Sequence, residues 1–285
     1  MARQQVAGCC RLLSRDAAFR RPVAPPTMIL RQFLHTDPVV AASYLVGCGG
    51  QGVAAVIDPV GDPSLYLRSA AESGMAIRYV IDTHVHADHI SSGSALAMHA
   101  GARYVLHAHA GATYDFFSVH DGERLKLGNV VADVLHVPGH TPEHIALVVT
   151  DRTRSEEAWV VFTGHTLMVG DMGRTELATS AEEGARALFA SAERLRALPD
   201  YVSVLPGAFS GSVCGRGLSG NPISTIGFER RFNRAFAITD REQFITHMMR
   251  DIPPPPVDAA VTRALNLGIV KPTGHHAAAA TGTAV

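Results

Sequence analysis

A dense group of metal-ligating side chains lies in residues 83–89, which read Thr-His-Val-His-Ala-Asp-His. The group follows an apolar run, residues 77–81, that is typical of a buried strand. Alternate side chains of an extended backbone share a face, so we expect His84, His86 and Asp88 to converge on one point. Imidazole nitrogens and carboxylates are ligands that borderline divalent metals prefer. The alternative is that these are ordinary surface histidines at a strand end. The chain holds 15 histidines, so a cluster could arise by chance.

Two later segments place a histidine on a tight turn after an apolar run. Residues 138–141 read Pro-Gly-His-Thr, and residues 163–166 read Thr-Gly-His-Thr. Together with residues 83–89, they bring polar ligands from three strand ends to one edge of a sheet. The spacing therefore predicts a metal site that includes His140 and His165.

The elements that must position these residues alternate between strands and helices. Short apolar runs bounded by Asp, Pro and Gly predict strands at residues 29–34, 43–48, 53–57, 77–81, 103–106, 145–149, 159–162 and 202–205, with a hairpin over residues 125–137. Helical periodicity predicts helices near residues 62–74, 89–99, 181–198, 240–250 and 258–267. This order predicts an α+β fold in which two sheets lie between helices, with the site on the rim.

The bulk composition is that of an ordinary soluble globular enzyme, with 47% hydrophobic and 18% charged residues among 285. The formal net charge of −1 gives no basic excess of the kind that nucleic-acid surfaces need. Four cysteines form no Cys-x-x-Cys pair, which favours a reducing compartment. Residues 38–57 carry no charge, but their central glycines favour two strands joined by a turn over a membrane span.

The two ends of the chain differ from the rest in composition. Residues 1–27 are rich in arginine and poor in acids, and Met28 has the look of an alternative start. We expect a disordered extension and a cytoplasmic protein, with a mitochondrial transit peptide and the mitochondrial matrix as the alternative. Residues 28–270 are expected to form one domain with C-terminal helices, and residues 271–285 a disordered Ala/Gly/Thr-rich tail.

The motifs at residues 84–89 and 138–141, with Gly-Asp-Met-Gly-Arg-Thr at residues 170–175, resemble the metallo-β-lactamase superfamily. Residues 211–215 and 224–231 are more similar to the persulfide dioxygenase (sulfur dioxygenase) branch than to the thioesterase branch related to glyoxalase II. The likeness covers about residues 28–268. It implies an αββα sandwich with a metal site at the sheet-edge rim.

The resemblance also implies a ligand set and a reaction. Such dioxygenases hold one non-haem Fe(II) through positions that fall at His84, His140 and His165, and they oxidise a glutathione-type persulfide with O₂ to sulfite and thiol. Two residues depart from the family pattern. His165 replaces an aspartate, and Ala208 replaces the histidine of a Pro-Gly-His-Gly turn.

These departures favour one metal per chain, iron with zinc as the alternative. A dinuclear hydrolase needs a bridging carboxylate and a full second ligand set, which His165 and Ala208 do not supply. Two His and one carboxylate form the usual non-haem Fe(II) site, and three histidines keep that geometry possible. The alternatives are a thioester hydrolase of glyoxalase II type, and a metal- or thiol-binding relative without turnover whose site is weak or vacant.

The remaining candidates carry smaller predictions. We expect His86, Asp88 and His89 to support the ligands or to remain from a second metal site, rather than to bind the metal. Arg174 is expected either to bind a substrate carboxylate or to form a structural salt bridge, and Cys214 either to lie near the persulfide or to pack as a small apolar residue. Partners are expected to be a thiol persulfide and O₂, without nucleic acid or membrane, and a homodimer is a possible assembly. Four other histidines are predicted on the surface or in loops: His99, His107, His109 and His120. His144 is expected in ordinary packing, with a place near the pocket as the alternative.

Overall fold

The computed structural model describes residues 28–252, 254–256 and 258–271. It contains two six-stranded sheets. Sheet A has the order β1 (Met28–His35), β2 (Ala41–Cys48), β3 (Val53–Ile57), β4 (Ala76–Ile81), β5 (Arg103–His107) and β6 (Phe117–Val119). Sheet B has the order β12 (Ser224–Thr225), β11 (Ser203–Pro206), β10 (Val160–Gly164), β9 (Ile145–Asp151), β8 (Val130–His136) and β7 (Arg124–Leu127). The predictions for residues 1–27 and 272–285 lie outside the described residues.

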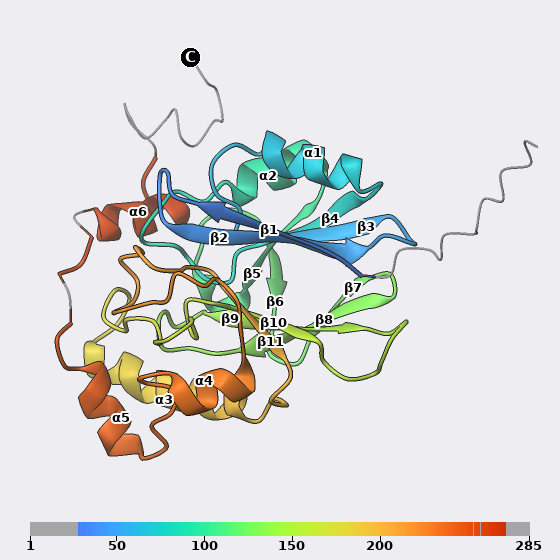
Figure 1. Ribbon diagram of the computed structural model, residues 1–285. Helices are drawn as coiled ribbons and strands as arrows, with labels where there is room; N and C mark the ends of the chain where they lie inside the picture. Colours follow the sequence, from blue (N-terminus) through green and yellow to red (C-terminus); the bar gives the residue numbers. More distant parts are fainter. Residues whose placement is uncertain (1–27, 253, 257, 272–285) are drawn as a thin grey trace, which may run out of the picture.

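The two sheets pack face to face between two layers of helices (Figure 1). The core between them joins apolar side chains of both sheets, including Tyr44 and Phe162, whose ring centroids are 4.9 Å apart. Helices α1 (Ser64–Glu72) and α2 (Gly93–Ala100) cover the outer face of sheet A. Helices α3 (Ala181–Arg196), α4 (Ile226–Phe232) and α5 (Arg241–Met248) cover sheet B, while α6 (Ala259–Asn266) lies at one end of the sandwich.

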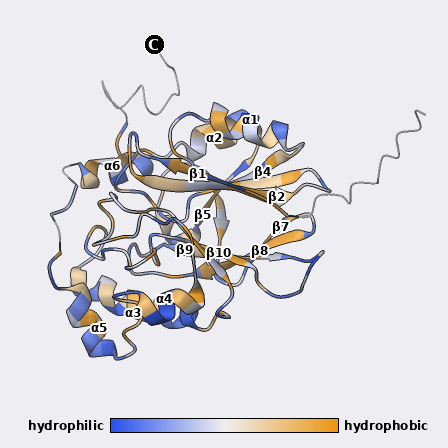
Figure 2. Ribbon diagram, viewed as in Figure 1, coloured by the Kyte–Doolittle hydropathy of each residue, from blue (hydrophilic) through white to orange (hydrophobic). Residues whose placement is uncertain are grey.

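Hydrophobic residues follow this layering, because each helix must bury one apolar side (Figure 2). In α3, for example, Ala185, Leu188, Ala192 and Leu195 are buried at helical spacing against sheet B. The helix starts at Ser180, whose hydroxyl accepts a hydrogen bond from the Glu183 N–H. The predicted αββα sandwich is therefore confirmed.

Strand direction decides where the ligands gather. Strands β3, β4, β5 and β6 run parallel, so their carboxyl ends share one edge of sheet A. Strands β8 and β10 are both antiparallel to β9, and β11 is parallel to β10, so these three also end at a common edge. Residues 83–89, 138–141 and 163–166 each follow one of these ends, which explains why they meet.

Most predicted elements are present within two or three residues of their expected bounds. The hairpin β7–β8 turns at Gly128 and Asn129, as predicted, and the uncharged residues 38–57 form most of the hairpin β2–β3. None of the helices in the described part of the chain is long and apolar enough to cross a membrane. The sequence did not indicate β6, β12 or α4. All three are short and draw their stability from packing rather than from their own periodicity.

Candidate metal centre

Three buried histidines meet at the rim between the two sheets. His84 follows β4, His140 follows β8, and His165 follows β10; each is 1% exposed. One nitrogen from each lies within 4.8 Å of the others. The structure thus brings together the three residues that the sequence singled out as ligands.

A hydrogen-bonded chain prepares His84 to bind a metal. The Thr83 hydroxyl donates to Asp58 Oδ2 at 2.9 Å, so its oxygen accepts from Nδ1–H of His84, also at 2.9 Å. The proton on Nδ1 leaves Nε2 of His84 with a lone pair, and this buried nitrogen has no hydrogen-bond partner. An unpaired buried nitrogen is costly, and a metal ion would satisfy it.

His140 is oriented in the same way by a backbone group. Its Nδ1 donates to the carbonyl oxygen of Arg174 at 2.7 Å, which again leaves the lone pair on Nε2. That nitrogen lies 3.3 Å from Nδ1 of His165. Two nitrogens about 3.3 Å apart suit neighbouring ligands of one ion, because metal–nitrogen bonds are about 2.0–2.1 Å long. The residues present therefore fit a metal.

His144 holds His165 rather than binding a metal itself. Its Nε2 accepts from the backbone N–H of His165 at 3.0 Å, and its Nδ1 pairs with the Thr166 hydroxyl at 3.1 Å. Its ring also stacks on His84, with centroids 4.7 Å apart. Gly164 permits this approach, because its φ is +48° and a Cβ there would meet the Thr83 hydroxyl and the His144 ring. His144 was predicted to pack ordinarily, with a place near the pocket as the alternative; its contacts with His165 and His84 agree with the alternative.

The three candidate ligands are uncharged at neutral pH. Burial lowers the pKa of His140 to about 3 and takes the pKa of His84 well below its usual value. Burial also lowers the pKa of His165. Neutral imidazole is the form that binds metal.

His86 does not join this group. Burial opposes its charged form, but the nearby carboxylates of Asp58, Asp82 and Asp88 outweigh burial and raise the pKa of His86 to about 9. Its Nε2 lies 3.5 Å from Asp58 Oδ1, at ion-pair distance. This ion-pair geometry agrees with a supporting role for His86.

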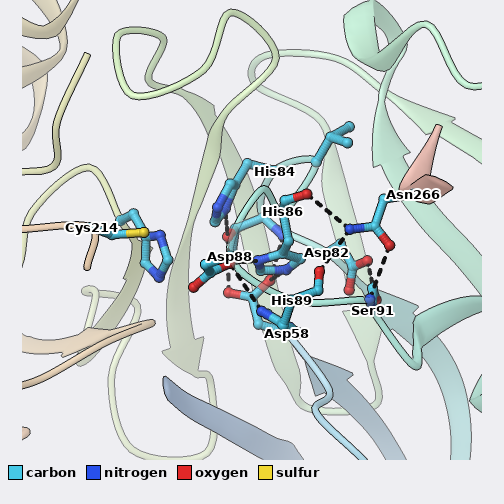
Figure 3. A network of polar contacts seen from close by, with 12 residues as sticks. Asp58, Asp82, His84, His86, Asp88, His89, Ser91, Cys214 and Asn266 are labelled. Carbon is cyan, nitrogen blue, oxygen red and sulfur yellow. Dashed lines mark hydrogen bonds and ion pairs between the residues drawn. The ribbon is translucent and has the colours of Figure 1, made fainter. Parts of the chain in front are cut away.

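His84, His86 and Asp88 lie next to one another, with the His84 and His86 ring centroids 4.2 Å apart and His86 Nδ1 3.8 Å from Asp88 Oδ1, but they form no common candidate ligand group and the expected strand geometry is absent. Residues 82–90 form bends rather than a strand, so the side chains do not alternate between two faces. Asp88 instead pairs with His89 at 3.0 Å, and these two form a separate group with His86 (Figure 3). The imidazole of His89 outweighs burial and holds the pKa of the Asp88 carboxyl well below its usual range.

Helix α6 anchors the backbone of this bent segment. The amide nitrogen of Asn266 donates to the carbonyl oxygens of His86 and His89, both at 2.8 Å, and its oxygen accepts from Ser91 N–H at 3.0 Å (Figure 3). Arg263 donates to the carbonyl oxygen of Val85 at 2.9 Å.

A buried carboxylate completes this anchor. Glu143 accepts from the backbone N–H of Val85 at 2.9 Å and forms an ion pair with Arg263 at 3.1 Å. Sequence reasoning missed Glu143, Arg263 and Asn266, because no local pattern near residue 143 or in residues 258–267 marks their distant contacts.

Cys214 and Arg174 both lie close to the centre. The Cys214 sulfur forms a further candidate group with Asp88 and His165. Burial, followed by the Asp88 charge, raises the pKa of the Cys214 thiol well above its usual value, so it stays protonated. The Arg174 guanidinium pairs with Glu176 and donates to the carbonyl oxygens of Val213 and Pro254. This is the salt-bridge alternative for Arg174; substrate binding stays a prediction.

Ala208, the second residue that departs from the family pattern, has apolar surroundings. Ala208 is fully buried and packs in a small cluster with Met168 and Leu218. It therefore offers no ligand to a second metal.

The peripheral histidines separate into two kinds. His99, His109 and His120 are exposed, as predicted. His107 is not: it is 4% exposed, because it ends β5 and stacks on the ring of His136, with centroids 4.1 Å apart. The prediction of a surface position for His107 is therefore wrong.

Comparison with known proteins supports the same family. A family model described as the metallo-beta-lactamase superfamily matches residues 36–207. The human protein named "Persulfide dioxygenase ETHE1, mitochondrial" is 27% identical over 269 residues, which cover 92% of this chain and 97% of that protein. A Polaromonas protein named "Hydroxyacylglutathione hydrolase" is 34% identical over 169 residues, 58% of this chain and 60% of the relative.

A solved structure extends the likeness to three dimensions. The crystal structure of ETHE1 from Myxococcus xanthus matches with a TM-score of 0.72 and 32% identity, covering 84% of this chain and 99% of the other. The family model spans more than half of the chain, and the fold has two sheets with a histidine centre at their rim. The chain belongs to the metallo-β-lactamase superfamily.

Proposed function

We propose that this chain is an Fe(II)-dependent persulfide dioxygenase with one metal ion in the candidate centre. The reaction would be RSSH + O₂ + H₂O → RSH + SO₃²⁻ + 2H⁺, with a glutathione-type thiol as R. His84, His140 and His165 would hold the iron. Fe(II), when bound, supplies the redox chemistry that lets O₂ react with sulfur.

One observation carries this proposal: three neutral histidine nitrogens converge, while the position of a further ligand is occupied by a buried alanine. The group of His84, His140 and His165 is complete without Ala208. Three ligands leave positions open for substrate and O₂, as a non-haem iron site requires. Three uncharged ligands also leave the ion positive, which suits an anionic persulfide.

The chain's own residues would hold the metal ligands in the binding tautomer and exclude water from the centre. The Thr83 hydroxyl keeps the proton of His84 on Nδ1, and the Arg174 carbonyl oxygen does the same for His140. In both rings Nε2 is therefore unprotonated and free to bind the metal. Burial of all three candidate ligands keeps bulk water away from the reacting atoms. Cys214 stays a thiol beside the centre, because burial raises its pKa. It is therefore a weak competitor of the persulfide for the metal.

The comparisons also support a dioxygenase more than a hydrolase. The human persulfide dioxygenase aligns over nearly the whole of both chains, whereas the Polaromonas hydrolase aligns over about three fifths of each. The hydrolase identity is higher over its shorter span, so thioester hydrolysis is the second candidate.

The test follows two reactions in the same iron-loaded preparation. With glutathione persulfide, an oxygen electrode should record O₂ consumption, and sulfite should appear in equal amount. His140→Ala should abolish both signals, while His99→Ala, an exposed histidine, should leave them unchanged. Thioester cleavage without O₂ uptake would replace the proposal with the hydrolase, and silence in both assays would indicate a relative without turnover.

A further inference from the structure

A second group of histidines lies at the same rim, outside the centre described above. His107 ends β5, His109 lies in the short 3₁₀ helix Ala108–Ala110, and His136 ends β8. One nitrogen from each of the three lies within 4.8 Å of the others. The ring of His120 lies beside them, 6.3 Å from that of His107 between centroids.

We propose that His107, His109 and His136 form a second metal site, which binds a borderline divalent cation such as Zn²⁺ and ties sheet A to sheet B. Imidazole suits zinc, nickel and copper, and three histidines with one further ligand make a common zinc geometry. His120 or a water molecule would take the fourth position.

His136 is already prepared as a ligand. Its Nε2 donates to the carbonyl oxygen of Pro142 at 2.8 Å, so Nδ1 carries the lone pair. Metal-bound histidines are commonly oriented by such a bond from the other ring nitrogen to a carbonyl group. Its backbone N–H is also fixed, by Asp121 at 2.8 Å.

His107 is held neutral inside the group. Its ring is parallel to that of His136, with an interplanar angle of 8°. Burial and the neighbouring histidines lower the pKa of His107 to about 4, so the two rings do not repel as cations. The contact from the His109 N–H to Nδ1 of His107 is long, at 3.3 Å, and would be lost at little cost.

The position of the group explains why a cation there would have an effect. His109 is exposed, so an ion can enter from solvent, while His107 is buried at the end of β5. The bonds would join the end of β5 in sheet A to the end of β8 in sheet B. The chain continues from β8 into residues 138–141, which carry His140, so the site would also steady one ligand of the candidate centre.

The experiment counts zinc in full-length, iron-loaded protein. Equilibrium dialysis against Zn²⁺ should show that His109→Ala/His136→Ala binds one zinc fewer than the wild type. The rise in Tm on adding Zn²⁺ should shrink in the same variant. The matched control is His99→Ala, which removes an exposed histidine from α2. His275 and His276 remain in every protein, so any zinc they bind cancels in the comparison.

A milder variant guards against misfolding. His109→Ala alone changes an exposed side chain and should weaken zinc binding at this site by at least about 10-fold, since one of three ligands is lost. The proposal is overturned if the double variant binds as much zinc as His99→Ala, or if the extra zinc of the wild type binds only in the millimolar range, as scattered surface histidines do.

Discussion

Removing the side chain of Asn266 should loosen the candidate metal centre although Asn266 binds no metal. Asn266→Ala deletes three hydrogen bonds to the backbone of residues 86–91, two at 2.8 Å and one at 3.0 Å. At about 1 kcal/mol net for each bond, the segment loses roughly 2–3 kcal/mol of stabilisation. Because these residues adjoin His84 and position His86 and Asp88, we expect metal affinity to fall by about 10-fold, the lower end of such effects.

The measurement is metal retention during dialysis against a graded chelator, with unfolding in urea followed in parallel. Asn221→Ala is the matched control, because Asn221 is exposed and its oxygen accepts one backbone hydrogen bond, from Ile223. Equal metal retention in the two variants would refute the role of α6 as an anchor. A fall in stability with unchanged metal affinity would refute the coupling between α6 and the centre.

Three further predictions concern the centre itself. Metal analysis of the His109→Ala/His136→Ala variant, which lacks the proposed second site, should give close to one ion per chain, mainly iron, when the protein is purified without added metal; two zincs per chain in this variant would favour the hydrolase. His165→Ala should sharply reduce metal retention and His86→Ala should reduce it less, whereas His165→Asp should keep the metal because a carboxylate fits the same set; full occupancy in His165→Ala would contradict the ligand assignment. Thr83→Val removes the hydroxyl that fixes the His84 tautomer and should weaken metal affinity by roughly 10–100-fold; an unchanged affinity in the chelator assay would show that the hydroxyl is dispensable.

The sequence could predict the layers of the fold and the three candidate ligands because both rest on local patterns. Apolar runs and turn residues indicate the strands, and a histidine directly after a strand must lie at the edge of its sheet. His84, His140 and His165 each satisfy this rule, so their meeting follows from parallel strand ends.

Contacts that cross the chain could not be predicted in the same way. Arg263 and Asn266 reach residues 85–91 from about 180 positions away, and no periodicity records such a contact. The extended geometry assumed for residues 84–88 failed for a related reason. Asp58, from the end of β3, accepts from the backbone N–H of Thr83 at 2.6 Å and attracts His86, and the segment bends around it.

The two residues that the resemblance marks as departures from the family pattern lie at the ends of neighbouring strands. His165 follows β10 and Ala208 follows β11, and these strands pair side by side, with Gly164 opposite Pro206. The backbone N–H of Gly207 donates to the carbonyl oxygen of Gly164 at 2.7 Å. A Cβ on Gly207 would stand 3.1 Å from the ring of His165.

An imidazole at position 165 is larger than the aspartate that the family resemblance implies there, and its ring lies beside Gly207 at the end of β11. The neighbouring position is held by Ala208, which is fully buried against Met168 and Leu218. A second imidazole there would overpack this cluster, at a cost of about 1–3 kcal/mol. Ala208 therefore suits a centre whose ligands are His84, His140 and His165 alone. This set favours three neutral nitrogens around one ion over two ions bridged by a carboxylate.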